Sequence, residues 1–106
     1  EMFKSGGENV YPREVEEIIE LDEAVLFAAV IAVPDEIFQE VGWAWIMLQP
    51  GKETTESAVE NLCRAKLANY KVPKRFFIRK NLPLLANGKI DKAALREEAK
   101  KILEEQ

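Results

Sequence analysis

Hydrophobic and polar residues alternate along the first half of the chain in patterns that predict one helix and two strands. From Pro12 to Glu20 apolar residues recur at helical spacing behind a proline at the first helical position, which predicts a short helix. Ala24 to Val33 is almost continuously apolar, which is typical of a central strand covered on both faces. Val41 to Leu48 follows as a second strand, and period-two alternation places Trp43 and Trp45 on the same face.

The second half of the chain predicts two more helices separated by a third strand. Thr54 or Thr55 caps a helix with one apolar face, and Lys71-Val72-Pro73 is expected to end it. Lys74 to Arg79 reads as the third strand, and Asp91 caps a final helix after a turn. These elements predict an α+β domain: a small three-stranded sheet with about three helices packed on it.

Size and composition restrict what this domain does alone. At 106 residues it holds a core but no deep enclosed active site. No apolar run approaches the roughly 20 residues of a membrane span, and we see no signal peptide. One cysteine and no histidine exclude a zinc site, a Ser-His-Asp triad and a histidine base, and they favour the cytoplasm. Cys63, on an apolar helix face, is expected to be a buried hydrophobe.

Charge is distributed unevenly along the chain. The net charge is -4, but residues 61–90 contain eight Lys and Arg and no Asp or Glu, so the remainder carries -12. Two interpretations stay open at this point. The basic stretch is either a solvated face or a surface that meets an anion such as a phosphate or a nucleotide.

Two glycine-containing loops stand out as candidate sites. Asn87-Gly88 is a strong tight-turn signal, and Lys89 directly after it is either a solvated lysine or an ammonium presented to a partner. Gly6-Gly7 forms a second loop, whose backbone can approach another surface closely. No Walker loop or Gly-x-Gly-x-x-Gly is present, so tight ATP binding by these residues alone is not expected.

Three segments, in this order and spacing, resemble one family. They are similar to the interdomain-hinge motif, the Leu-x-x-Tyr-x-x-Pro motif and the final Gly-Lys motif of adenylate-forming (AMP-binding) enzymes. Here these motifs read Lys4-Ser5-Gly6-Gly7-Glu8-Asn9-Val10-Tyr11-Pro12, Leu67-Ala68-Asn69-Tyr70-Lys71-Val72-Pro73 and Asn87-Gly88-Lys89-Ile90-Asp91-Lys92. The resemblance spans essentially the whole chain and is strongest to acyl-CoA synthetases.

The resemblance implies that residues 1–106 are the mobile C-terminal lid of a two-step acid-thiol ligase and were cut from a longer protein. A fatty or aryl carboxylic acid and ATP would form an acyl-adenylate and pyrophosphate, and CoA would then displace AMP. A large N-terminal domain of the same chain would hold ATP, Mg²⁺ and the acid. The lid alone is expected to be inactive.

The resemblance also implies residue roles. Lys89 corresponds to the catalytic lysine of the adenylation step, and Gly7 to the position beside the pantetheine arm of CoA. Phe38 stands where some relatives carry tryptophan, and Gln39 follows where glycine is common. The residues implied in binding CoA are Lys4, Gly6, Gly7, Glu8, Phe38, Tyr70, Lys71 and Lys74.

Two alternatives remain open. The thiol acceptor could be the phosphopantetheine of a carrier protein in place of CoA. A function of another class is a small basic-faced module that binds nucleic acid, since aromatic residues stand beside lysines from Tyr70 to Phe77. The negative total charge and the lack of a nucleic-acid motif argue against that module.

Overall fold

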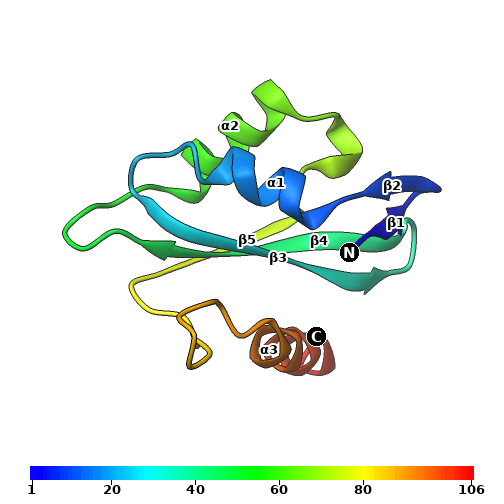
Figure 1. Ribbon diagram of the computed structural model, residues 1–106. Coiled ribbons are helices and arrows are strands. Elements are labelled where there is room, and N and C mark those ends of the chain that lie inside the picture. The colour runs from blue at the N-terminus through cyan, green and yellow to red at the C-terminus, as the bar shows by residue number, and fades with distance from the viewer.

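In the computed structural model, which describes residues 1–106, one mixed sheet lies between two helical layers (Figure 1). Helices α1 and α2 cover one face, and α3 covers the other. The elements in chain order are β1 (Phe3–Ser5), β2 (Glu8–Val10), α1 (Pro12–Ile19), β3 (Val25–Asp35), β4 (Gln39–Leu48), α2 (Glu56–Lys66), the 3₁₀ turn η1 (Asn69–Lys71), β5 (Arg75–Arg79) and α3 (Lys92–Glu104).

The α+β class is confirmed, but the sheet has five strands and not three. The two additional strands, β1 and β2, form a hairpin of three residues each around Gly6-Gly7. Strands this short are below the length at which alternation is recognisable, so the sequence indicated only a loop. Strand β4 lies at the centre, antiparallel to β3 along its length and parallel to β5 from Trp43 onward.

The placement of β3 at the centre of the sheet was wrong, although its burial on both faces is confirmed. β3 pairs only with β4, so its other edge has no strand beside it. Two carboxylates, one in α1 and one at its C-cap, accept hydrogen bonds from that edge: Glu16 from the Val30 N–H at 2.9 Å, and Glu20 from the Ala28 N–H at 3.2 Å. Backbone groups that would otherwise attract another strand are thereby satisfied.

Two hydrophobic clusters hold the layers together. Ala44 and Ile46 point into the cluster under α1 and α2, whereas Trp43 and Trp45 point into the cluster under α3, as the alternation predicted. Leu95, on α3, is fully buried in the second cluster. None of the three helices combines the length and apolar character that a bilayer crossing requires.

The predicted helix starts are confirmed, and one predicted end is wrong. The hydroxyl of Thr55 accepts a hydrogen bond from the Ala58 N–H, and the carboxylate of Asp91 accepts one from the Ala94 N–H. Helix α2 ends at Lys66, before the predicted end at Lys71-Val72-Pro73, and Tyr70 lies in η1. The following Pro73 explains a break in this region, but the helix stops several residues earlier than that signal indicated.

Candidate functional site

The turn that carries Lys89 projects from the domain on a firmly held base. The N–H of Leu85 donates to the carbonyl of Lys89 at 2.7 Å, and the N–H of Gly88 donates to the carbonyl of Leu85 at 2.9 Å. Gly88 has a φ of 86°, as expected for the left-handed position of a three-residue hairpin loop. Asn87 does not share this conformation, and its side-chain oxygen accepts from the Lys89 N–H.

The Lys89 ammonium is free to meet a partner. The side chain is exposed, and it forms none of the ion pairs in the domain. Behind the turn, the Asp91 N–H donates to the Pro83 carbonyl at 2.9 Å, and Leu82 is buried. A hydrogen-bonded backbone with an exposed, unpaired cation at its tip suits electrostatic contact with another domain or a substrate.

The start of α3, next to this turn, is tied to the opposite helical layer. The ammonium of Lys92 lies 2.8 Å from a carboxylate oxygen of Glu16 and 3.2 Å from one of Glu1. Glu16 is 3% exposed, and the guanidinium of Arg13 also contacts it. This ion-pair network, centred on the buried Glu16, links the start of α3 to α1.

A second candidate site forms where the β1–β2 hairpin meets the β3–β4 loop. We call it the hairpin surface: Gly6, Gly7, Phe38 and Lys74. The N–H of Gly6 donates to the Phe38 carbonyl at 2.8 Å, and the Lys74 ammonium lies 5.0 Å from the centre of the Phe38 ring. The fold thus brings together three of the sequence segments that were implied in CoA binding.

Both glycines of the hairpin surface have left-handed backbones. The φ of Gly6 is 57° and that of Gly7 is 85°, and a Cβ at Gly7 would meet no atom within 4 Å. A Cβ at Gly6 would lie 3.5 Å from the Phe38 ring. The space beside Gly7 is therefore open to a ligand, and the backbone conformation explains why glycine occupies both positions.

The remaining residues implied in CoA binding lie around the hairpin surface, and one of their two lysines is paired with an acid. Strand β2 packs against η1, which brings Tyr70 and Lys71 near the hairpin. Lys71 is paired with Glu14 at 2.9 Å, and the hydrogen bond that its ammonium donates to the Glu14 carboxylate raises the pKa of Lys71. Lys4 and Glu8 are exposed on β1 and β2.

The basic stretch is not a continuous cationic face. Three of its eight cations are neutralised by acids from outside the stretch: Arg64 by Glu60, Lys71 by Glu14 and Arg79 by Glu98. Arg75 stacks against Trp43 and Phe77 with its guanidinium about 5 Å from each ring. Lys74 in the hairpin surface and Arg75 next to it remain unpaired, and Arg75 was not among the residues that the resemblance implied.

Arg79, Glu98 and Trp45 form a structural network between β5, α3 and β4. Two guanidinium nitrogens of Arg79 donate to the two carboxylate oxygens of Glu98, and the indole N–H of Trp45 donates to one of them at 3.3 Å. The Arg79 hydrogen bond lowers the pKa of Glu98 against the opposing effect of burial. This network holds α3 to the sheet.

The domain contains neither a reactive thiol nor a cluster of metal-ligating side chains. Cys63 is fully buried, and burial raises the pKa of its thiol to about 11, so no thiolate nucleophile is available. No three His, Cys, Asp or Glu side chains lie close enough together to hold a metal ion.

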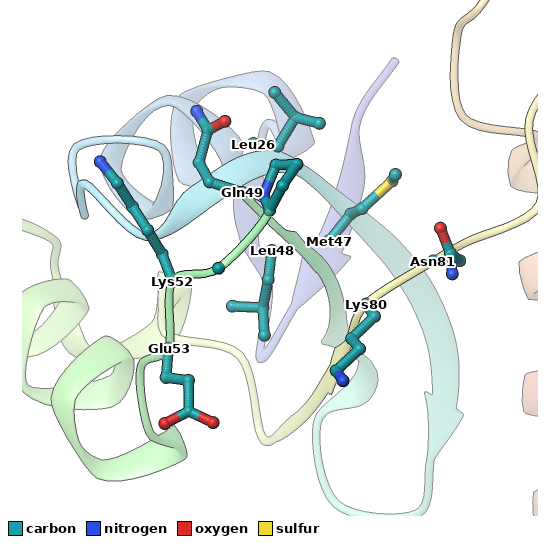
Figure 2. Close-up of a pocket in the computed structure, with 10 residues that line it drawn as sticks. Leu26, Met47, Leu48, Gln49, Lys52, Glu53, Lys80 and Asn81 are labelled. Atoms are coloured by element: carbon teal, nitrogen blue, oxygen red, sulfur yellow. The ribbon is translucent and has the colours of Figure 1, made fainter.

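A hollow of about 510 Å³ lies at the other end of β4 (Figure 2). It is lined by Leu26 of β3, by Leu48 at the end of β4, by the turn after β4 with Lys52, and by Lys80, which follows β5. The Lys52 and Lys80 side chains point in different directions, and Glu53 extends to the same side as Lys80 (Figure 2). Because its charges do not converge, the hollow is not built for one anion.

The Lys89 turn and the hairpin surface are far apart. The hairpin surface lies beside Gln39, where β4 begins, and Lys80, which leads to the Lys89 turn, lies beside Leu48, where β4 ends. Ten extended residues place these ends about 30 Å apart. The Lys89 turn also lies in the layer of α3, below the sheet in Figure 1, whereas the hairpin is on the opposite side.

Comparison with known proteins identifies relatives of the whole domain. Residues 14–89 match the family model of the AMP-binding enzyme C-terminal domain. The chain is 42% identical over 94 residues to a long-chain-fatty-acid–CoA ligase of Bacillus subtilis, covering 89% of this chain and 17% of that protein. It is 41% identical over 98 residues to the 2-methylpropanoate–CoA ligase CCL4 of Humulus lupulus, covering 91% and 18%.

A solved structure shares the fold. ATP-bound MatB from Rhodopseudomonas palustris superposes with a TM-score of 0.86 at 35% identity, covering 95% of this chain and 20% of that one. The chain thus spans about a fifth or less of the length of these relatives.

Proposed function

The chain belongs to the family of AMP-binding enzyme C-terminal domains, and from this we propose that it is the mobile lid of an AMP-forming acyl-CoA synthetase. The proposed reaction joins a carboxylic acid to CoA in two steps, through an acyl-adenylate. The named CoA ligases among its relatives support this activity. Their acids differ, so we propose only the class of a fatty or aryl acid.

We assign the first step to the Lys89 turn. A carboxylate attacking the α-phosphate of ATP brings two anions together, and negative charge grows on the phosphoryl oxygens. A positioned ammonium offsets this repulsion where water is excluded. The observation that carries the proposal is the position of Lys89, exposed and unpaired at the tip of a turn whose base is held by hydrogen bonds.

We assign the second step to the hairpin surface. The open space beside Gly7 would let the pantetheine arm approach the acyl-adenylate, and Phe38 and Lys74 would contact the arm or the CoA nucleotide. Lys74 and Arg75 supply unpaired positive charge for the CoA phosphates. Lys71 contributes less, because Glu14 partly neutralises it.

Two functional surfaces about 30 Å apart require the lid to change orientation between the steps. One orientation would present Lys89 to the active site, and a rotated one would present the hairpin surface. ATP and Mg²⁺ would be held mainly by the large domain, since the lid offers neither a phosphate-binding loop nor a cluster of metal ligands.

Two alternatives remain to be separated by experiment. A carrier-protein phosphopantetheine presents the same thiol arm as CoA, and the hairpin surface would suit either acceptor. Binding of nucleic acid is disfavoured, because the cations of residues 61–90 are dispersed and three of them are paired with acids.

The test uses the complete ligase that carries this lid. With a panel of fatty and aryl acids, we expect acid-dependent pyrophosphate exchange, followed by thioester formation when CoA is added. Transfer to a carrier protein and not to CoA would support the first alternative. If no acid supports exchange, and RNA binds the protein with a steep salt dependence, the ligase proposal is refuted.

A further inference from the structure

Gln39 has a backbone conformation that its residue type disfavours. Its φ is 75°, and it is the only non-glycine residue of the chain with a positive φ. A left-handed conformation costs a non-glycine residue free energy, and residues held in such conformations cluster at functional sites. Gln39 is exposed, so packing of its side chain in the core does not account for the choice of residue.

The position of Gln39 places a polar side chain at the edge of the hairpin surface. It follows Phe38 directly, and in the sheet register it lies opposite Ser5, the residue before Gly6. Directly opposed residues in an antiparallel pair have Cα atoms about 5 Å apart, so the long side chain of Gln39 can reach the Gly6-Gly7 loop. The space beside Gly7 is open on the same hairpin.

The loop that imposes this backbone is held independently of the Gln39 side chain. The carboxylate of Asp35 accepts hydrogen bonds from the Ile37 N–H at 3.0 Å and the Phe38 N–H at 2.9 Å. The Phe38 carbonyl accepts from Gly6, as described above. The side-chain amide of Gln39 takes part in none of the hydrogen bonds within the chain, so its donor and acceptor are available to a ligand.

We propose that the Gln39 amide is a hydrogen-bonding contact for the pantetheine arm of the thiol substrate and helps to set its affinity; this role rests on the proposed function. The pantetheine arm contains two secondary amides, each with one N–H donor and one carbonyl acceptor. A primary amide side chain provides both complementary groups. Gln39 is therefore a specificity residue of the second half-reaction and has no part in adenylation.

The test compares Gln39→Gly with the wild type in the complete ligase. Glycine removes the amide and also the backbone strain, so the melting temperature should not fall. The KM for CoA in thioester formation from a supplied acyl-adenylate should rise between roughly twofold and tenfold, which is the change in affinity expected when one hydrogen bond is lost. Pyrophosphate exchange should be unchanged. Gln39→Asn, which tolerates the left-handed backbone but is one methylene shorter, should show an intermediate KM.

Glu36→Ala is the matched control, because Glu36 is an exposed residue of the same loop and should leave the KM unchanged. Pantetheine in place of CoA should show the same rise with Gln39→Gly, since it retains the arm and lacks the nucleotide. An unchanged KM in a Gln39→Gly enzyme of equal or higher melting temperature would overturn the proposal. So would a rise with CoA that is absent with pantetheine. If the wild type loads only a carrier protein, the CoA assignment fails, but the same variants test Gln39 against its phosphopantetheine.

Discussion

Replacing Lys89 by alanine tests the catalytic assignment most directly. When a carboxylate and an α-phosphoryl oxygen approach to about 4 Å, two unit charges repel by about 4 kcal/mol at an effective dielectric constant of about 20. If the Lys89 ammonium offsets most of this repulsion, its removal slows adenylation by about 10³-fold, because each 1.36 kcal/mol changes a rate tenfold. Mutations that remove single electrostatic stabilisers cause losses of similar size, about 10²–10³-fold.

The structure separates this effect from misfolding. Lys89 is exposed and unpaired, so the variant should change the free energy of unfolding by no more than about 0.5 kcal/mol. Pyrophosphate exchange measures the first step, and thioester formation from a supplied acyl-adenylate measures the second, which should be retained. Lys101→Ala, an exposed lysine on α3, is the control and should leave both steps intact. Exchange that falls less than tenfold in Lys89→Ala would refute the assignment.

Three further predictions follow from the geometry. Gly7→Leu should impair thioester formation and leave pyrophosphate exchange intact. Gly51→Leu is its control, because both glycines have a positive φ and no atom within 4 Å of an added Cβ, and equal losses of thioester formation in the two variants would indicate backbone strain alone. Glu98→Gln should lower the melting temperature at pH 7, because Arg79 depresses the pKa of Glu98 below its ordinary 4.5 and the pair stabilises the fold above that value. This stabilisation is lost as pH falls through the depressed pKa, so the melting temperatures of the variant and the wild type should converge in acid, and a difference that stays constant with pH would contradict the pairing. Cys63 should resist iodoacetamide in the folded protein at pH 8 and react after denaturation, as peptide mass spectrometry would detect; rapid native labelling would show that the thiol is accessible.

Local chemistry made several features readable from sequence. The turn at Asn87-Gly88, the caps at Thr55 and Asp91 and the opposite faces of the β4 tryptophans and their neighbours depend on residues close together in the chain. The exposure of Lys89 follows for the same reason, because a tight turn leaves its tip in solvent.

Other features depend on which segments meet in space. The apolar run of β3 indicates that both faces of the strand are buried, but it does not indicate which strands pair with it. The sequence therefore predicted a central strand, although Glu16 and Glu20 occupy its free edge. The basic stretch could be counted in sequence, yet the acids that neutralise Arg64, Lys71 and Arg79 lie outside it.

By itself the sequence determined the helices, the long strands and the lysine-bearing turn, because propensity, periodicity and capping act within a few residues. Only the tertiary structure decided that Gly6, Phe38 and Lys74 form one surface and that Gln39 takes a left-handed backbone beside it. It also decided that this surface and Lys89 lie at opposite ends of the domain. The physical reason is that strand pairing and loop closure bring together residues distant in the chain, and their contacts have no local signature.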